Sequence, residues 1–502
     1  MELDPARCYR AVLSRDRRFD GRFFTGVVTT GIYCRPVCPV APPKFENMRF
    51  HACAAAAEAA GFRPCKRCRP ETAPGTPAWV GTSAVVSRGL RLISEGGLDA
   101  GNLEALATRL GLGERQLRRL FAQHLGASPL DVARARRVHF ARTLIDQTRL
   151  PFAEIAHSAG FQSIRQFNHD MKETFRETPT ALRGRRTTRG GAHKSADGSP
   201  AGILVKLPYR PPLAWTAMLD FLAHRAIPGV ESVENGSYRR TIAMGDASGV
   251  IEVSPGATPD APADGAASPH HVPHLLMRVE LPHCPNLIGV VERARRIFDL
   301  GADPASIGEH LGRDPRLAPR LAALPGLRVP GAWDPFELAV RAVLGQQVTV
   351  QGATTLAGRL VREFGKPLEV ASGPLTHLFP CAATIAAADL SRIGLPRARS
   401  AALRNLAAAV VDGELRFDAA LGLDDAVARL RAIAGLGPWT AHYIAMRALA
   451  EPDAFPESDL GLRRALGNAG ALASVAEVRE RAEAWRPWRS YAAIYLWMED
   501  AS

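Results

Sequence analysis

The 502-residue sequence contains no apolar run approaching the ~20 residues that a helix needs to cross a bilayer. Its first residues, Met1-Glu2-Leu3-Asp4, lack the charged and then apolar pattern of a secretory signal. These absences argue against a membrane or secreted protein, so we expect no membrane partner and a reducing, cytoplasmic location. Because disulfides are rare in such a compartment, the eight cysteines are better explained as metal ligands or nucleophiles.

Acidic residues are too few to balance the basic ones. The chain has 63 Lys and Arg against 50 Asp and Glu, which gives a net charge of +13 and a pI near 9.8. This surplus predicts a polyanionic partner, with nucleic acid as the leading candidate. Composition alone does not separate DNA from RNA or from an anionic membrane. The length exceeds one ordinary core, and three domains are the default expectation.

Four cysteines form two close pairs, Cys34-x-x-x-Cys38 and Cys65-x-x-Cys68, separated by 26 residues. Two pairs at this spacing are typical of a tetrahedral zinc site, so we expect one Zn²⁺ bound by these four thiolates. The metal would stabilise a unit that has only a small apolar core. A purely structural zinc ribbon is the alternative to a site with chemistry of its own.

Basic residues crowd this site, namely Arg35, Lys66, Arg67 and Arg69. Four thiolates and one Zn²⁺ carry a net charge of minus two, which repels DNA phosphates. A methyl group on one sulfur would lower that negative charge and raise the affinity for DNA, because phosphate contacts dominate affinity. The pattern therefore allows a chemical switch at the zinc site.

A helix-turn-helix pattern occurs twice. The first copy has a helix over 103–112 that ends in a glycine turn and a second helix over 114–121. The second copy begins at Pro151, turns at Gly160 and continues in a helix over 164–172, after a connecting helix over 133–144.

In this motif the second helix of each copy presents polar side chains to a major groove. The predicted DNA-contacting residues are Arg115, Arg118, Arg119, Arg165 and Gln166. The alternative is an ordinary helical bundle with a basic face.

Near the C-terminus, Gly435-Leu436-Gly437-Pro438-Trp439 predicts a tight hairpin between two helices. The glycines permit a sharp turn, and Pro438 suits the first turn of a helix. Backbone N–H groups at such a turn can hold a DNA phosphate without reading sequence. Asp459 follows a proline-containing loop at the start of the next helical run. The alternative is a plain helix–helix turn with Asp459 as a helix cap.

Residues 184–202 are basic and then rich in Gly and Ser, which predicts a flexible linker. Strand-like and helical stretches alternate beyond it, with a Pro-rich surface insertion over 255–273 that is expected to be disordered. From residue 287 onward the pattern is almost entirely helical. The predicted elements before that point lie at 203–207, 215–222, 238–244, 250–253 and 275–281.

Two motifs carry a resemblance to a known family. Thr30-Gly31-Ile32-Tyr33-Cys34-Arg35-Pro36 and Gly61-Phe62-Arg63-Pro64-Cys65-Lys66-Arg67-Cys68 resemble the N-terminal domain of the Ada alkylation-response proteins. The resemblance implies zinc at Cys34, Cys38, Cys65 and Cys68, with Cys34 as the irreversible acceptor of a methyl group from a DNA methylphosphotriester. The repeated helix-turn-helix resembles the AraC-type DNA-binding domain. The Pro-Cys-His-Arg motif of the methyltransferase domain that often follows in Ada proteins is absent here.

The hairpin with Asp459 resembles the helix-hairpin-helix DNA glycosylases, and residues 203–497 resemble the AlkA alkylpurine glycosylases. This resemblance implies that Asp459 is the catalytic carboxylate. Trp439 stands where members that also cleave the DNA backbone have a Lys, which implies a monofunctional enzyme. Three aromatic residues would line the base pocket, and Gln347 occupies the place of the Leu that AlkA inserts into the duplex. The three aromatic residues are Trp439, Tyr443 and Trp497.

Together these patterns predict a mainly α, multidomain protein with a small zinc-bound α/β domain, an all-α double helix-turn-helix domain, an α/β AlkA-type domain and an all-α helix-hairpin-helix glycosylase core. The expected boundaries are 1–75 for the zinc domain, 83–183 for the helix-turn-helix domain, 184–202 for the linker, 203–286 for the AlkA-type N-terminal domain and 287–502 for the glycosylase core.

The expected function is alkylation repair joined to its regulation. The C-terminal part would excise alkylated purines of the 3-methyladenine type by base flipping, and methylation of Cys34 would switch on sequence-specific transcription activation. The expected partners are alkylated and promoter DNA as duplexes, and RNA polymerase, with the chain a monomer at the bacterial nucleoid. One alternative is a methyl-sensing activator whose C-terminal part binds damage without activity. Another is a repair enzyme whose helix-turn-helix repeat only localises it on DNA.

Overall fold

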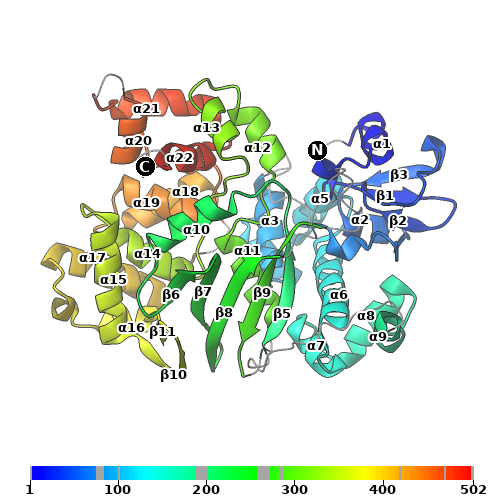
Figure 1. The fold of residues 1–502 in the computed structure, drawn as a ribbon, viewed down its shortest axis with the longest axis horizontal. Helices are drawn as coiled ribbons and strands as arrows, with labels where there is room; N and C mark the ends of the chain where they lie inside the picture. The colour runs from blue at the N-terminus through cyan, green and yellow to red at the C-terminus, as the bar shows by residue number, and fades with distance from the viewer. Residues whose placement is uncertain are drawn as a thin grey trace. The chain divides into compact units, whose positions relative to one another are not determined.

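The computed structural model describes residues 3–74, 84–99, 102–187, 202–256, 272–282, 284, 286–417, 421–467 and 471–498. The chain divides into two compact units. The first consists of Met1–Arg210, Pro255–Glu292 and Leu300–Ala302, and the second of Pro211–Ser254, Arg293–Asp299 and Asp303–Ser502. Figure 1 shows the elements coloured in chain order from blue to red.

The zinc module, residues 3–74 of the first unit, is a four-stranded sheet with short helices. The strand order is β3-β1-β2-β4, and β2 and β4 run parallel while the other neighbours are antiparallel. Phe23, Phe24 and Tyr33 are buried in its small core. Its elements are α1 (Pro5–Leu13), η1 (Arg17–Phe19), β1 (Phe24–Val27), β2 (Ile32–Cys34), η2 (Phe45–Asn47), β3 (Met48–His51), α2 (Ala54–Ala59), β4 (Arg63–Pro64) and η3 (Pro70–Thr72).

The helix-turn-helix module, residues 84–187 of the first unit, is all helical and contains both predicted copies of the motif. Gly111 (φ +70°) and Gly160 (φ +82°) make the two turns in the left-handed region that glycine favours. Ser128 forms a capping box with Asp131, so the connecting helix begins before the predicted residue 133. The helices are α3 (Ala84–Ser94), α4 (Leu103–Arg109), α5 (Glu114–Leu125), α6 (Pro129–Gln147), α7 (Phe152–Ser158), α8 (Ile164–Phe175) and α9 (Pro179–Thr187).

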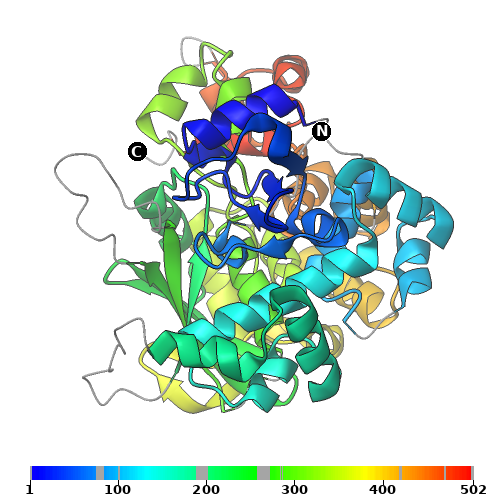
Figure 2. The ribbon, with the colours of Figure 1, turned by 90° about the vertical axis from the view of Figure 1, so that its right-hand side faces the viewer.

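A partly buried hydrogen-bond network joins these two modules within the first unit, where Figure 2 shows them in dark blue and cyan. Glu58 of α2 accepts hydrogen bonds from the Tyr33 hydroxyl at 2.8 Å and from His139 Nε2 of α6 at 2.7 Å. Burial lowers the pKa of His139, but the charge of Glu58 and its hydrogen bond outweigh burial, so the pKa lies above the ordinary 6.5. A protonated His139 therefore stabilises the contact.

Two ion pairs also join the two modules. Lys66, in the loop between two zinc-site cysteines, pairs with Glu177, and Arg69 pairs with Asp146 of α6. The residues that directly follow Cys65 and Cys68 thus connect the zinc module to the helix-turn-helix module through ion pairs, in addition to the hydrogen bonds of Glu58.

Strands β5 (Ile203–Pro208) and β9 (His274–Glu280) form an antiparallel pair in the first unit. In the second unit, β6 (Glu231–Glu234), β7 (Ser237–Met244) and β8 (Ala247–Pro255) form an antiparallel meander next to α10 (Trp215–Ala223). β6 is the only one of these elements that the sequence pattern missed among the described residues. Helix α11 (Leu287–Ile297) begins in the first unit and ends in the second.

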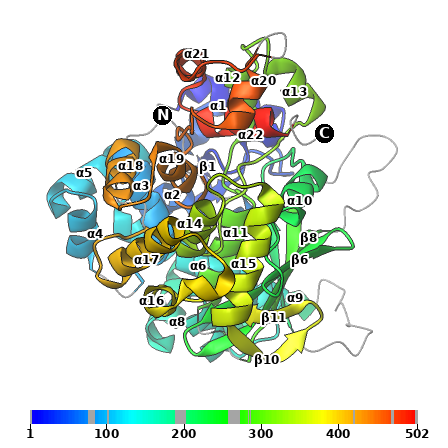
Figure 3. The same cartoon turned by 90° about the vertical axis from the view of Figure 1, so that its left-hand side faces the viewer.

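The rest of the second unit is a helical assembly. The helices of this assembly are α12 (Pro304–Leu311), α13 (Ala318–Ala323), α14 (Pro335–Leu344), α15 (Val350–Phe364), α16 (Ala382–Ala387), η4 (Leu390–Ile393), α17 (Arg397–Val411), α18 (Leu423–Ala432), α19 (Pro438–Arg447), α20 (Leu460–Ala465), α21 (Val475–Ala482), η5 (Glu483–Trp485) and α22 (Arg489–Trp497). Helix α14 is almost wholly buried. It packs against α15, α17 and α19, which lie around it in Figure 3.

One hairpin interrupts this helical run where the sequence pattern gave no strand. β10 (Lys366–Ser372) and β11 (Leu375–Leu378) pair antiparallel around a turn with Gly373 at φ +64°. Thr376 donates its backbone N–H to Gly229 O at 2.8 Å, and the Thr241 hydroxyl donates to His377 O at 2.8 Å. The hairpin is thus held by residues more than a hundred positions earlier, which no local pattern reveals.

Parts of the two segments predicted to be irregular fall outside the described residues, namely 188–201 of the predicted linker and 257–271 of the predicted insertion. Residues 75–83, after the zinc module, also lie outside the described residues. Helix α9 extends to Thr187, four residues into the predicted linker. The predicted fold class is confirmed by the elements described above. Within the described part of the chain, no helix combines the length and apolar character that a bilayer crossing requires.

The His139–Glu58 contact generates a pH prediction. Because the folded pKa of His139 is raised, its stabilisation is fully present below pH 6.5 and is lost as the pH rises through the folded pKa. Replacement His139→Gln should lower the unfolding free energy of the first unit by about 1–3 kcal/mol at pH 6 and by less at pH 9. Thermal or urea unfolding of the full chain at both pH values measures the difference. The exposed His157→Gln serves as the control, and a wild-type minus variant difference that stays constant with pH would contradict the assignment.

Candidate functional site

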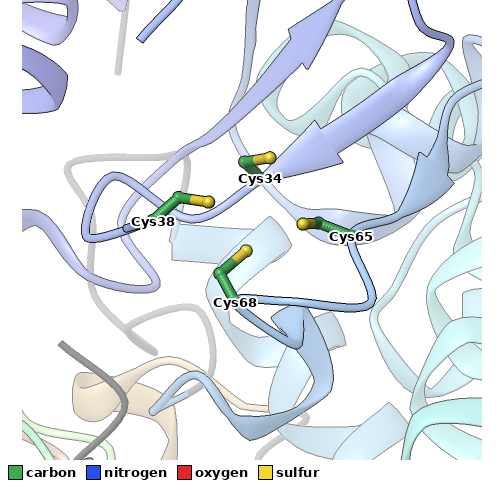
Figure 4. Close-up of side chains that lie close together, drawn as sticks. All are labelled: Cys34, Cys38, Cys65 and Cys68. Carbon is green, nitrogen blue, oxygen red and sulfur yellow. The ribbon is translucent and has the colours of Figure 1, made fainter. Parts of the chain in front are cut away.

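The four predicted zinc ligands converge at one end of the zinc-module sheet. Strands β2 and β4 pair in parallel, with Tyr33 opposite Pro64, so Cys34 and Cys65 follow adjacent positions on neighbouring strands. Cys38 and Cys68 come from the loops behind them. The four Sγ atoms lie within 4.8 Å of one another and point toward a common centre, as Figure 4 shows.

The donor set fits a zinc ion. Four thiols without a disulfide supply the soft ligands of a tetrahedral structural site. The backbone N–H of Arg35 points at Cys68 Sγ at 3.4 Å, and that of Arg67 at Cys65 Sγ at 3.4 Å, as suits thiolate sulfur. Hydrogen bonds within the cluster lower the pKa of Cys38 and Cys65 and raise the pKa of Cys34 and Cys68. The prediction of one Zn²⁺ is confirmed by this cluster.

Exposure distinguishes one of the four cysteines. Cys38, Cys65 and Cys68 are buried, whereas Cys34 at the end of β2 is partly exposed. Cys34 is therefore the residue of this cluster with the largest exposed fraction.

The basic residues around the cluster are mostly engaged within the protein. Arg35 is buried, pairs with Asp20 and donates to Cys68 O at 3.1 Å. Lys66 and Arg69 form the ion pairs described above, while Arg67 is exposed. Arg67 is thus the best placed of these four cations to meet a phosphate.

The predicted DNA-contacting residues lie on the outer faces of α5 and α8. Leu117 and Phe121 of α5, and Phe167 of α8, are buried on the inner faces. Ser163 caps α8 by accepting from Gln166 N, which fixes where this helix starts. The exposed positions are Arg115, Arg118, Arg119 and Arg165, and Gln166 is half-buried.

In the second unit, the glycine hairpin joins α18 to α19 as predicted. Gly435 has φ +98°, and a Cβ at this position would lie 2.4 Å from Ala402 Cβ of α17. Glycine is therefore required both by the backbone angle and by the close packing. Gly437 caps α19 and lies at the exposed tip of the turn.

Asp459 lies at the centre of the predicted base pocket. Its Oδ2 accepts from Trp439 Nε1 at 2.8 Å, and its Oδ1 accepts from Trp497 Nε1 at 2.8 Å and from the Leu462 backbone N–H at 3.1 Å. The last contact makes Asp459 the N-cap of α20. Asp459 is therefore a helix cap, as the alternative interpretation predicted, and the same carboxylate also accepts the two indole N–H groups of the predicted base pocket.

The predicted aromatic residues gather at this carboxylate. The rings of Trp439 and Tyr443 stack with centroids 5.1 Å apart and an interplanar angle of 14°. The Tyr443 ring lies 6.1 Å from that of Trp497. All of these side chains are half-buried, so they remain partly open to solvent. Helices α19, α20 and α22 together supply two indoles, one phenol and one carboxylate.

Sequence reasoning missed a basic residue behind the pocket. Arg447 is buried, and its Nη1 donates to the Tyr443 hydroxyl at 2.6 Å while its Nε donates to Pro330 O at 2.7 Å. Burial raises the pKa of Tyr443, but the charges of Arg447, Arg225 and Arg341 outweigh it and the pKa is lowered. Arg447 follows Tyr443 by four residues on one helix, and this i,i+4 spacing was the available signal.

Gln347 lies in the loop between α14 and α15. It is exposed and adopts φ +56°, a left-handed conformation that is uncommon for residues other than glycine. The loop thus presents this side chain away from the protein core.

The zinc centre generates a prediction about metal content. Replacement Cys65→Ser should remove the bound zinc, because a hydroxyl is a poor substitute for a thiolate, and should destabilise the zinc module. Zinc content by mass spectrometry should fall from one ion per chain toward zero. The exposed Cys381→Ser should retain the full content. Equal zinc content in both variants would contradict the ligand assignment.

Four family models match successive parts of the chain. They are the metal binding domain of Ada over residues 7–71, a helix-turn-helix domain over 106–185, the AlkA N-terminal domain over 204–334 and the HhH-GPD superfamily base excision DNA repair protein over 340–490.

One relative matches nearly the whole chain, and two others match parts of it. The chain is 45% identical over 497 residues to a probable bifunctional transcriptional activator/DNA repair enzyme AlkA of Mycobacterium tuberculosis, covering 99% of this chain and 97% of the relative. It is 35% identical to DNA-3-methyladenine glycosylase 2 of Escherichia coli over 59% of this chain and 96% of that protein. It is 34% identical to the Escherichia coli bifunctional transcriptional activator/DNA repair enzyme Ada over 35% of this chain and 48% of that protein.

The match to the mycobacterial relative runs over nearly the whole length of both chains. The four models follow one another in the order that the motifs predicted. The chain therefore belongs to the family of bifunctional transcriptional activator/DNA repair enzymes in which an Ada metal-binding domain and a helix-turn-helix domain precede an AlkA-type helix-hairpin-helix domain.

Proposed function

We propose that this protein excises alkylated purines of the 3-methyladenine type from duplex DNA, and that methyl transfer to Cys34 switches on sequence-specific transcription activation. The observation that carries the first activity is the Asp459 carboxylate between two indole N–H groups, whose rings both pack against that of Tyr443. Excision would be carried out by residues 203–286 together with 287–502. Methyl transfer would belong to residues 1–75, and promoter binding to residues 83–183.

Asp459 acts as an anion in this proposal. An alkylated purine is positively charged, so its glycosidic bond is already weakened and the base leaves as a neutral molecule. Positive charge then develops on the sugar. Asp459 stabilises that charge, activates the attacking water, or does both. The three N–H donors fix its orientation before the substrate arrives.

The aromatic side chains would bind the flipped base. Trp439, Tyr443 and Trp497 provide electron-rich faces, and a cation over such a ring gains about 0.5–2 kcal/mol. Trp439 also stands where an amine would be needed to form a Schiff base with the sugar. The product is therefore an abasic site with an intact DNA backbone.

The hairpin and the exposed loop would handle the DNA itself. Gly435 and Gly437 place backbone N–H groups at the tip between α18 and α19, where they can hold a phosphate. Gln347 would fill the gap that the flipped base leaves in the stack.

Cys34 would be the methyl acceptor. Its thiolate attacks the methyl carbon of a methylphosphotriester, an S–C bond forms, the C–O bond breaks, and the phosphodiester leaves as an anion. The partial exposure of Cys34 supports this choice among the four cysteines. Zinc, when bound, keeps the sulfur in its thiolate form. The thioether product is stable, so this site acts once per molecule.

Methylation would raise DNA affinity by removing one negative charge next to Arg67. Promoter binding would use Arg115, Arg118, Arg119, Arg165 and Gln166 on the outer faces of α5 and α8. The further partner would be RNA polymerase, and the chain would act as a monomer in the cytoplasm at the nucleoid, where its DNA substrates are. A methyl-sensing activator with an inactive C-terminal part is the second candidate, and the assembled Asp459 pocket favours the enzyme over it.

Base release tests the glycosylase. Asp459→Asn should lower the release of 3-methyladenine from methylated duplex DNA by roughly 10²–10⁴-fold, because the neutral amide cannot stabilise a positive sugar or activate water. The control is Glu457→Gln, a half-buried carboxylate on the same loop that pairs with Arg479. Lack of release by folded, zinc-loaded wild type would eliminate the enzyme in favour of the damage-binding alternative.

Mass analysis tests the methyl transfer. After incubation with DNA that contains methylphosphotriesters, the peptide with Cys34 should gain one methyl group, and Cys34→Ala should gain none. A promoter reporter in cells under methylating stress should be induced by wild type and not by Cys34→Ala. The control Cys381→Ser should behave as wild type in both assays. Methylation without induction would favour a helix-turn-helix module that only localises the enzyme.

A further inference from the structure

Gln346, the residue before the exposed Gln347, connects three separate parts of the second unit. Its side-chain Nε2 donates to Gly435 O of the hairpin at 3.0 Å and to Thr440 Oγ1 of α19 at 3.0 Å. Its own carbonyl accepts from Arg399 Nη2 of α17 at 2.5 Å. The predicted functions of the hairpin and of Gln347 leave these contacts unexplained.

The contacts determine how Gln347 is presented. The carbonyl of Gln346 belongs to the peptide bond that precedes Gln347, so Arg399 fixes the plane from which Gln347 projects. Gln347 has φ +56°, and a non-glycine residue keeps this strained conformation only where its surroundings hold it. The hydrogen bonds donated by the Gln346 side chain and by Arg399 hold Gln347 in this conformation.

Helix α17 supports both ends of this arrangement. Arg399 reaches the loop before Gln347, and Ala402, one helical turn further on, packs directly under Gly435. Gln346 uses a carbonyl of the hairpin, so the bond does not consume an N–H group that a phosphate would need. The distance between the hairpin tip and Gln347 is thereby set by one helix and three hydrogen bonds.

We infer that Gln346 and Arg399 are positioning residues for base flipping. They hold Gln347 at a fixed distance from the hairpin that grips the DNA backbone, so that gripping a phosphate also aims Gln347 at the base stack. Flipping a base out of a duplex costs free energy, and a side chain on a loose loop would offset little of that cost. Neither residue contacts the Asp459 carboxylate in the described structure, so bond cleavage should not need them. The inference rests on the proposed glycosylase function.

The test compares two substrates that differ only in the need to flip. Gln346→Met keeps nearly the same side-chain volume but removes both donated bonds. Single-turnover release of the same alkylated purine should fall by about tenfold for duplex DNA, the effect of one or two hydrogen bonds, and by less than about twofold for single-stranded DNA. Fluorescence of 2-aminopurine opposite or beside the lesion should show less unstacking in the duplex.

Matched variants separate positioning from general damage to the fold. Gln351→Met makes the same chemical change at an exposed position of α15 and should leave both rates unchanged. Arg399→Met should resemble Gln346→Met, whereas Arg399→Lys should recover much of the duplex rate because it can still donate to the Gln346 carbonyl. Thermal unfolding midpoints check that each variant is folded.

The outcomes are distinct. Equal losses on both substrates would assign Gln346 a structural role and overturn the inference, and so would unchanged rates on both. No release by wild type from either substrate would overturn the proposed glycosylase function and this inference with it. An active wild type with an unchanged duplex-to-single-strand ratio in Gln346→Met would overturn the inference alone.

Discussion

The geometry of the C-terminal half depends on how one carboxylate is held. Asp459 accepts an indole N–H on each oxygen, from Trp439 and from Trp497, and a backbone N–H from Leu462. An ionised carboxylate offers only acceptor sites, so three donors satisfy it without neutralising it. Helices α19, α20 and α22 must therefore dock in one arrangement for the pocket to exist.

The surrounding core enforces that docking. Ser490 of α22 is fully buried, and its hydroxyl contacts Glu451 O and Ala454 O at 2.7 Å, which ties the loop before Asp459 to the helix that carries Trp497. Arg447 holds the Tyr443 hydroxyl from behind. Each aromatic ring of the pocket is thus fixed by a polar contact at its edge, and Trp439 and Tyr443 also stack on each other.

The zinc module is stabilised by a metal-binding cluster rather than by a large apolar core. Its apolar core is small, and the thiolate cluster supplies the missing cross-link between two loops. Its ties to the helix-turn-helix module run through Tyr33, next to Cys34, and through Lys66, next to Cys65. A change of charge or size at Cys34 would therefore occur next to Tyr33, which shares the Glu58 carboxylate with His139 of α6.

The sequence by itself determined the features that local rules control. The spacing of Cys34, Cys38, Cys65 and Cys68 predicted the zinc centre, glycines at 111, 160 and 435 marked turns that require positive φ, and family motifs placed Asp459 among its aromatic neighbours. Only the tertiary structure decided which partners these residues have. Trp439 and Trp497 bind Asp459 from 20 and 38 residues away, Arg399 reaches Gln346 across 53, and the β10–β11 hairpin is anchored more than a hundred residues upstream. Periodicity reports neighbours within a few turns or strand positions, whereas such partners are selected by the packing of whole helices, which no short pattern encodes.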